Sequence, residues 1–260
     1  MVIDNREGLI SEEEKRELAV KILNRKYGVG GDGLILLESS ALASFFMRIY
    51  NPDGSEPEMC GNGARCAVRF AVEEGMAEPP LEFETRAGVL KGEITPEGVK
   101  ITLPPLQYLQ DRVEIEVEEE KLELGFLNTG VPHAVLEVEE LESYPVEEKG
   151  RKIRYHPQFL PGGTNVDFVK YHPPHICRVR VYERGVEGET LSCGTGAVAS
   201  AILGIRRGRV TSPVEVVFVK SGESLRVYEE EGVITLEGKV WRSFKGKFLG
   251  ERWREEVRES

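Results

Sequence analysis

The chain has 260 residues and a mass of 29.1 kDa, which is enough for two domains of roughly 130 residues each. Hydrophobic residues make up 40% and charged residues 30%, as in a folded rather than a disordered protein. A net charge of -11 argues against nucleic acid or an anionic membrane as partner. The longest nearly apolar stretch, 197–205, is about half of what a bilayer crossing needs, and no leader sequence opens the chain. We therefore expect a cytoplasmic protein.

The first part of the chain predicts strands on either side of a helix. Apolar runs at 34–37 and 47–50 read as strands, and a third strand is expected at 80–83. Between them a glycine-rich turn carries Cys60 and leads into a helix that ends at Gly75. The apolar stripe of this helix consists of Ala64, Cys66, Val68, Phe70 and Val72.

The second part repeats this order. Strands are expected at 166–169, 178–182 and 213–216, and a glycine-rich turn with Cys193 leads into 197–205, which is apolar on most sides and therefore predicts a buried helix. The segment His172-Pro-Pro-His175 predicts a solvated turn.

The two parts are copies of one unit. Residues 59–64 match 192–197 at an offset of 133, and 47–50 match 179–182 at an offset of 132. Pro104-Pro105 marks the boundary. We expect a first domain over 1–106, a second over 107–249, and a charged terminal helix over 250–260 that packs on the first.

The repeated cysteines occupy a position that favours chemistry. Each stands before Gly-x-Gly at the mouth of a helix, where free N–H groups and the positive helix end favour an anion and lower a thiol pKa. Related by a pseudo-twofold axis, Cys60 and Cys193 would face each other across a cleft. Such a pair suits proton removal beside a carboxylate and reprotonation from the opposite face, so that a stereocentre is inverted without a cofactor.

The other two cysteines have no counterpart in the repeat. We interpret Cys66 and Cys177 as core residues. The sequence has no Cys-x-x-Cys pair and its four histidines do not gather near cysteines, so no metal site is expected.

Several segments, in order along nearly the whole chain, resemble those of diaminopimelate epimerase. They are Asn51-Pro-Asp-Gly-Ser, Met59-Cys-Gly-Asn-Gly-Ala-Arg-Cys, Asn128-Thr-Gly-Val-Pro-His133, Gly163-Thr-Asn-Val-Asp, Val181-Tyr-Glu-Arg184 and Ser192-Cys-Gly-Thr-Gly. The resemblance implies two pseudo-symmetric α/β domains, each a curved, barrel-like sheet around a central helix, with the active site between them. It also implies interconversion of LL- and meso-2,6-diaminopimelate, a step toward lysine and peptidoglycan, without cofactor or metal. A homodimer is a further expectation, which does not come from these motifs.

The resemblance also assigns roles to residues. Cys60 and Cys193 would be the acid/base thiols, and His133 and Glu183 would tune them. The remaining expected substrate-binding residues are Gly61, Asn62, Gly194 and Thr195 at the two helix ends, and Asn51, Asn165, Glu183 and Arg184 on polar groups of the substrate.

Two departures from the family pattern stand out. Val131 occupies a position where some members have Asn before Pro-His. Members of the family also open with a segment like Lys-Met-His-Gly-x-Gly-Asn-Asp-Phe, whereas this chain begins Met1-Val-Ile-Asp4. The internal repeat points the same way, because at its offset the counterpart of residues 128–134 would fall before Met1. We expect that the start of the first strand and one substrate-binding loop are missing, with a misassigned start codon as the simplest cause.

Alternative functions remain open from the sequence. Histidine racemase-like enzymes keep both cysteine motifs, whereas proline racemase-like enzymes typically carry His where Asn62 stands, and PhzF-like isomerases lack the thiol pair. There are also two alternatives without catalysis. One is a redox sensor that forms a Cys60–Cys193 disulfide, and the other is a binding protein that has lost catalysis together with its missing N-terminal loop.

Overall fold

The structure is a computed structural model that describes residues 1–246. The predicted helix at 250–260 lies outside these residues. The first part of the chain contains β1 (Val2–Asp4), α1 (Glu14–Ile22), β2 (Leu34–Glu38), β3 (Phe46–Tyr50), α2 (Gly61–Glu73), β4 (Leu81–Thr85), β5 (Gly88–Thr95) and β6 (Gly98–Thr102).

The second part has the same order with additions before β9, after α3 and after β11. It contains β7 (Tyr108–Val117), β8 (Glu120–Asn128), β9 (Pro132–Glu137), α3 (Val146–Arg154), the 3₁₀ turn η1 (Pro157–Phe159), β10 (Asn165–His172), β11 (Ile176–Glu183), β12 (Gly188–Thr190), α4 (Gly194–Arg206), β13 (Val214–Phe218), β14 (Ser224–Glu230) and β15 (Val233–Gly238).

The strands form one continuous sheet whose order is symmetrical about its middle. The order is β1-β2-β3-β4-β5-β6-β15-β14-β13-β11-β10-β9-β8-β7, with β12 paired to β11. On both sides of the central antiparallel β6–β15 pair the strand directions match: β3–β4 and β11–β13 are parallel, as are β1–β2 and β9–β10. The internal repeat of the sequence is therefore a repeat of the fold.

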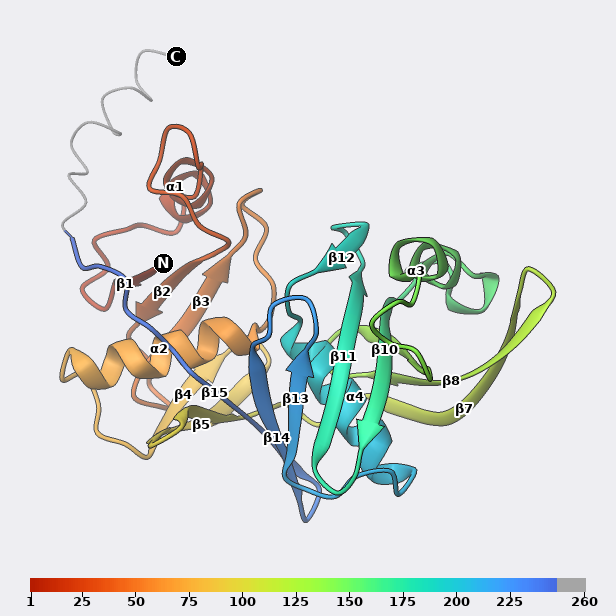
Figure 1. Ribbon diagram of the computed structural model, residues 1–260. Helices are drawn as coiled ribbons and strands as arrows, with labels where there is room; N and C mark the ends of the chain where they lie inside the picture. The colour runs from red at the N-terminus through yellow and green to blue at the C-terminus, as the bar shows by residue number, and fades with distance from the viewer. Residues whose placement is uncertain (247–260) are drawn as a thin grey trace.

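Each half of the curved sheet holds one long helix. α2 contacts β5 and β6 together with β1 to β3, and α4 contacts β8 to β11, β13 and β14 (Figure 1). Two glycines in the strands let the helices approach this closely, because a Cβ on Gly92 would lie 2.5 Å from Val68, and one on Gly125 would lie 2.5 Å from Leu203. The expectation of a curved sheet around a central helix in each half is confirmed.

The helices bury what their sequences predict, with one shift. Residues 196–204 of α4 are all buried. In α2 the buried face includes Ala64, Ala67, Val68 and Ala71, together with Arg65, whereas Cys66 is only half-buried. The interpretation of Cys177 as a core residue is confirmed, since it is fully buried, but Cys66 only borders the core, because it lies beside the buried face of α2.

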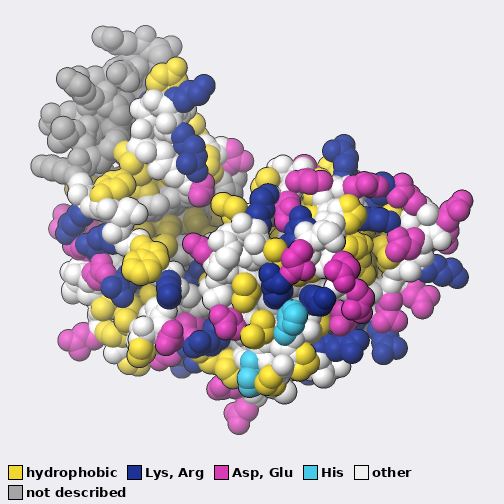
Figure 2. Space-filling model, viewed as in Figure 1, with side chains coloured by type: hydrophobic (Ala, Val, Ile, Leu, Met, Phe, Trp, Pro, Cys, Tyr) yellow, Lys and Arg dark blue, Asp and Glu magenta, His cyan; other side chains and the backbone are white. Residues whose placement is uncertain are grey.

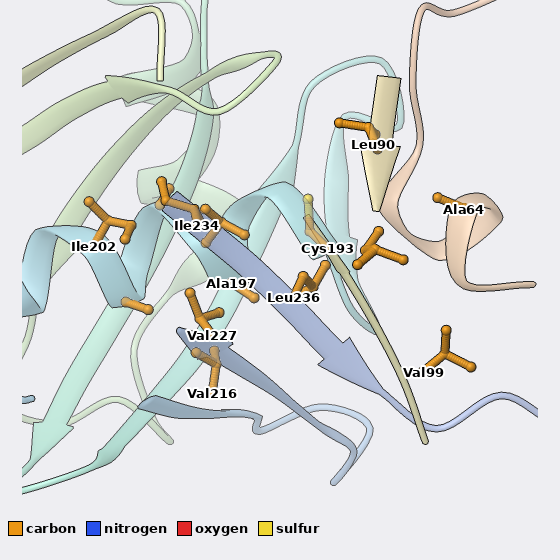
Figure 3. Close-up of a cluster of buried hydrophobic side chains, with 14 of the residues drawn as sticks. Ala64, Leu90, Val99, Cys193, Ala197, Ile202, Val216, Val227, Ile234 and Leu236 are labelled. Carbon is orange, nitrogen blue, oxygen red and sulfur yellow. The ribbon is translucent and has the colours of Figure 1, made fainter. Parts of the chain in front are cut away.

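The two halves share a core. One cluster of buried side chains runs from Leu90 and Val99 through Leu236 to Ala197 and Ile202 (Figure 3). Two smaller clusters lie under α1 and α3. No helix within residues 1–246 is long and apolar enough to cross a membrane. The predicted turn at 172–175 is exposed and joins β10 to β11.

Candidate active site

The two repeated cysteines have the same place in the backbone. Cys60 is the N-cap of α2 with φ -145° and ψ 119°, and Cys193 is the N-cap of α4 with φ -141° and ψ 113°. In each case the cysteine carbonyl accepts the first helical hydrogen bond, from Ala64 at 2.8 Å and from Ala197 at 2.9 Å. Each cysteine therefore stands at a helix N-terminus, where N–H groups without an intrahelical partner favour negative charge, and at α4 the Gly196 N–H donates to the Cys193 side chain.

The two helix N-termini meet at the joint between the halves. A Cβ on Gly61 would lie 3.1 Å from the side chain of Leu236 in β15, and one on Gly194 would lie 3.7 Å from the same side chain. That Gly194 position is also 3.7 Å from Oδ1 of Asn62. Cys193 and Leu236 belong to one cluster of side chains (Figure 3). Gly61 and Asn62 of one helix end and Gly194 of the other, all predicted from the sequence, are thus brought together.

The surface is hollowed between the two halves. Figure 2 shows a notch between the lobe that carries α1 and the lobe that carries α3. Two further open hollows lie on the first half, around 16–20 and 53–55 and around 5–12, and contain neither cysteine. Among the described residues, no group of three or more His, Cys, Asp or Glu side chains is placed to hold a metal ion.

Cys193 lies at one end of a buried hydrogen-bonded chain. Its Sγ is 3.3 Å from Oγ1 of Thr195, which is 3.0 Å from Nε2 of His133, and Nδ1 of His133 is 2.6 Å from Oδ2 of Asp167. His133 and Asp167 are completely buried. Burial, together with the carboxyl groups of Glu183 and Asp167, raises the pKa of the Cys193 thiol to about 12, so the thiol form prevails at neutral pH. The expectation that the helix end lowers this pKa is therefore wrong for Cys193, because burial outweighs the helix end.

Glu183 and Asn165 frame the same end of the site. Burial raises the pKa of the Glu183 carboxyl group. The Asn165 side chain donates to the carbonyl of Pro132 at 3.1 Å and accepts from the N–H of Arg184 at 2.8 Å. The guanidinium of Arg184 donates to the carbonyl of Gly162 at 3.3 Å. Asn165 and Glu183 therefore lie near His133, whereas the Arg184 side chain is directed to the loop at Gly162.

The Cys60 end is built differently. Cys60 is half-buried, and next to it Oδ1 of Asn62 accepts a hydrogen bond of 2.6 Å from Arg65. Arg65 is 5% exposed, donates also to the carbonyl of Gly61, and has no ion pair with a carboxylate among residues 1–246. Burial lowers the pKa of this guanidinium. Asn51 points into its own turn, where its amide donates to Ser55 Oγ at 3.0 Å.

Sequence reasoning missed Asp167 and Arg65. Both belong to segments on which the resemblance rests, and the sequence around each contains a feature that could have pointed to it. Asp167 is a charged residue between Val166 and Phe168 in a buried strand, two positions after Asn165 and therefore on the same face. Arg65 is the fifth residue of α2, close to the positive helix end, and it is a buried cation without a carboxylate partner among residues 1–246. Each breaks a local rule, as functional residues often do.

The fold defines a class of protein. A crystal structure of a PhzF-family phenazine biosynthesis protein from Enterococcus faecalis has a TM-score of 0.69 and 19% identity, with 95% of this chain and 92% of that chain covered. A crystal structure of a hydroxyproline epimerase from Agrobacterium vitis has a TM-score of 0.62 and 19% identity, over 88% of this chain and 78% of that one. The chain thus shares the two-half α/β fold of PhzF proteins and proline racemase-like enzymes.

Sequence comparison narrows the class to one family. The diaminopimelate epimerase family model matches residues 1–109 and 125–242. A diaminopimelate epimerase of Hydrogenobaculum sp. is 42% identical over 257 residues, covering 95% of this chain and 93% of its own length, and one of Aquifex aeolicus is 41% identical over 263 residues, covering 96% and 94%. The chain belongs to the diaminopimelate epimerase family, as its motifs indicated.

Proposed function

We propose that this protein interconverts LL- and meso-2,6-diaminopimelate by a cofactor-independent mechanism with two thiols. The observation that carries the proposal is the matched pair of N-cap cysteines, Cys60 and Cys193, on two helices whose N-termini meet at Leu236. Membership of the family supports the choice of substrate. Such a site presents a sulfur and a set of N–H groups from each half to one small molecule.

The reaction is a proton exchange at the carbon next to a carboxylate. One cysteine, as the thiolate, removes the α-proton, and the electron pair left on carbon delocalises into the carboxylate. The free N–H groups at the N-termini of α2 and α4 stabilise the charge that develops there. The other cysteine, as the thiol, gives its proton to the opposite face of the carbon. Each turnover leaves the protonation states of Cys60 and Cys193 exchanged, so that the enzyme is ready for the reverse direction.

Binding is assigned to the residues around the cysteines. Gly61 and Gly194 leave the N–H groups of the first helical turns open to a carboxylate, and Asn62 and Thr195 add a polar side chain at each end. The charged and polar groups of the substrate would reach Asn51, Asn165, Glu183 and Arg184. His133 and Glu183 are assigned to tune the thiols: His133 reaches Cys193 through Thr195, and the Glu183 carboxyl group acts on Cys193 through its charge.

Domain closure completes this proposal. We assign residues 1–106 and 107–249 to two domains that close over the substrate by bending at the β6–β15 pair, which excludes water from the carbanion. The homodimer and the cytoplasmic location stay predictions. Sedimentation equilibrium of the purified chain tests the first, and cell fractionation tests the second.

Solvent deuterium exchange tests the function. In D₂O the protein is expected to introduce deuterium at the α-carbon of LL-diaminopimelate and to produce the meso isomer, and Cys60→Ala and Cys193→Ala are each expected to abolish this. Cys66→Ala is the matched control, since Cys66 lies in α2 without a counterpart in the repeat, and it should keep the activity. L-histidine and L-proline serve as control substrates. Unchanged exchange in either Cys60→Ala or Cys193→Ala excludes the two-thiol mechanism.

A further inference from the structure

A hydrogen-bonded chain links the Cys193 thiol to a buried carboxylate that has no assigned role. The chain runs from Cys193 through Thr195 and His133 to Asp167, with successive distances of 3.3, 3.0 and 2.6 Å. The histidine and the aspartate are inaccessible to solvent. Because all of its links lie within hydrogen-bond distance, the chain can hold a defined arrangement of protons.

The chemistry of the groups gives that arrangement a direction. A carboxylate only accepts, so Nδ1 of His133 carries the proton and donates to Asp167. Nε2 is then the acceptor and receives the Thr195 hydroxyl proton. The lone pairs of that hydroxyl remain free to accept from the Cys193 thiol. Every donor thus points from Cys193 toward Asp167.

The fold holds Asp167 in place. The parallel pairing of β9 and β10 sets Asn165 opposite His133, and Asp167 follows two residues later on the same face. Gly196 of α4 provides the space, because a Cβ there would lie 2.3 Å from Oδ1 of Asp167. Oδ1 is buried and has no hydrogen-bond partner among the described residues. A buried carboxylate with one oxygen unpaired costs free energy, and the close contact with His133 is what offsets it.

The hydrogen-bonded chain is present in the second half only. At the repeat offsets, Thr195 corresponds to Asn62 and Asp167 corresponds to Ile35. Among the described residues, the Glu183 carboxyl group at the end of β11 also lies near both His133 and Cys193, and Cys60 is the titratable group that the proposed site places opposite Cys193. The duplicated site is therefore asymmetric, with the carboxylates gathered around Cys193.

We propose that Asp167 is a positioning residue, which fixes His133 in the Nδ1–H tautomer and makes Thr195 and His133 a path for the Cys193 proton. In this step the Cys193 S–H proton passes to Thr195 Oγ1 while the Thr195 hydroxyl proton passes to His133 Nε2, giving a thiolate and an imidazolium that Asp167 stabilises. The reverse transfer restores the thiol, so no electrons are gained or lost. The role in catalysis rests on the function proposed above, but the tautomer does not.

Asp167→Asn is the variant that tests this role. It keeps the shape of the side chain but adds an N–H₂ group, which can donate to Nδ1 and move the histidine proton to Nε2, against the direction of the chain. We expect kcat for α-proton exchange to fall on the order of 10²-fold with KM nearly unchanged, and the pH profile of kcat to shift. Glu237→Gln is the matched control, since Glu237 is also a buried carboxylate, bound to Thr95 and Tyr228, and has no place in the site.

Nitrogen-15 NMR of imidazole-labelled protein measures the tautomer without substrate. With four histidines in the chain, His133→Gln assigns the His133 signals. The proposal expects a protonated Nδ1 and an unprotonated Nε2 in the wild type and in Glu237→Gln, and a changed pattern in Asp167→Asn. If Asp167→Asn does not fold, Thr195→Val removes the middle of the path and is expected to lower kcat with the Nδ1–H tautomer kept.

The two readouts separate the possible failures. A wild-type His133 with the proton on Nε2, or an Asp167→Asn variant with unchanged kcat and an unchanged pH profile, overturns the role of Asp167. Unchanged kcat in Thr195→Val overturns the path. A wild type without exchange activity, but with the expected tautomer and its loss in Asp167→Asn, removes the proposed function and leaves the positioning of His133 by Asp167 supported.

Discussion

Two glycines at equivalent positions of the two helices make different contacts, and this difference predicts a difference in stability. Gly63 and Gly196 each stand three residues after an N-cap cysteine. A Cβ at Gly63 would meet the side-chain tips of Ile49 and Ile35 at 3.1 and 3.2 Å, whereas one at Gly196 would meet Oδ1 of Asp167 at 2.3 Å. The isoleucine tips can give by a few tenths of an ångström, but Asp167 is held by His133.

The magnitude follows from comparing the two substitutions. Gly→Ala in a helix gains up to about 1 kcal/mol from propensity, and this gain cancels between Gly63→Ala and Gly196→Ala because their helix positions match. Gly196→Ala must in addition displace the carboxylate, at about 1–3 kcal/mol for overpacking and about 1.5–3 kcal/mol for the charge-assisted hydrogen bond to His133. We expect Gly196→Ala to be less stable than Gly63→Ala by about 3 kcal/mol.

Urea unfolding followed by far-ultraviolet circular dichroism at neutral pH measures this difference. A third variant, Gly196→Ala with Asp167→Ala, should recover part of the loss, since the new methyl group then occupies the space of the removed carboxylate. Equal free energies of unfolding for the two single variants would refute the reasoning, because the contact between Gly196 and Asp167 would then cost nothing.

Three further outcomes are expected. The folded state keeps Cys193 as a thiol with its pKa raised to about 12, so the stability that this group provides is complete below the pKa of an exposed cysteine, about 8.5, and is lost as the pH rises toward 12. Between pH 8.5 and 10, urea unfolding should therefore show that the wild type loses about 2 kcal/mol more unfolding free energy than Cys193→Ala, and equal losses would contradict this. Arg65→Met should leave the melting temperature unchanged or raise it, because it removes a buried charge without a carboxylate partner. The same substitution should raise the KM for diaminopimelate about tenfold because Asn62 loses its hydrogen-bond donor, and an unchanged KM in the exchange assay speaks against a role of Arg65 in holding Asn62. Gly125→Ala should cost about 1–3 kcal/mol of unfolding free energy through overpacking against Leu203. A double-mutant cycle with Leu203→Ala should show that most of this cost is coupled to Leu203, whereas additive effects would mean that the cost does not come from this contact.

The sequence predicted the elements that carry the cysteines, because these follow from local patterns. The strands near 34–37, 47–50, 166–169 and 178–182 are present, and the two glycine-rich turns do lead into helices. The helices begin earlier than their apolar stripes, at Gly61 and Gly194, because the glycines of the turns already have helical conformation. Periodicity detects the buried face of a helix and not its first turn.

Other elements left no comparable pattern. α1 and α3 are nine-residue helices rich in charged residues. The first and last residues of α3 each lie 132 positions after those of α1, which is the offset of the internal repeat, so the repeat extends further in the structure than in the sequence. Their helical form depends on packing of a few apolar side chains against the sheet rather than on propensity. The β6–β15 pair joins segments more than 130 residues apart, which no local signal determines.

The site shows the same division between what duplication repeats and what each half adds. Duplication accounts for two cysteines with matching N-cap backbone, because the turn and the helix start are encoded within a few residues in each copy. The polar side chains around the two cysteines are not duplicated. Where the second half has Thr195 and Asp167 the first has Asn62 and Ile35, and where the first has Arg65 the second has Val198. Cys193 thus lies beside carboxylates that favour its thiol form, whereas the buried charged group bound to Asn62 in the first half is the cation of Arg65. In the proposed mechanism a symmetrical scaffold would place two sulfurs on opposite faces of one carbon, and their roles as acid and base at the same moment would call for this unequal surrounding.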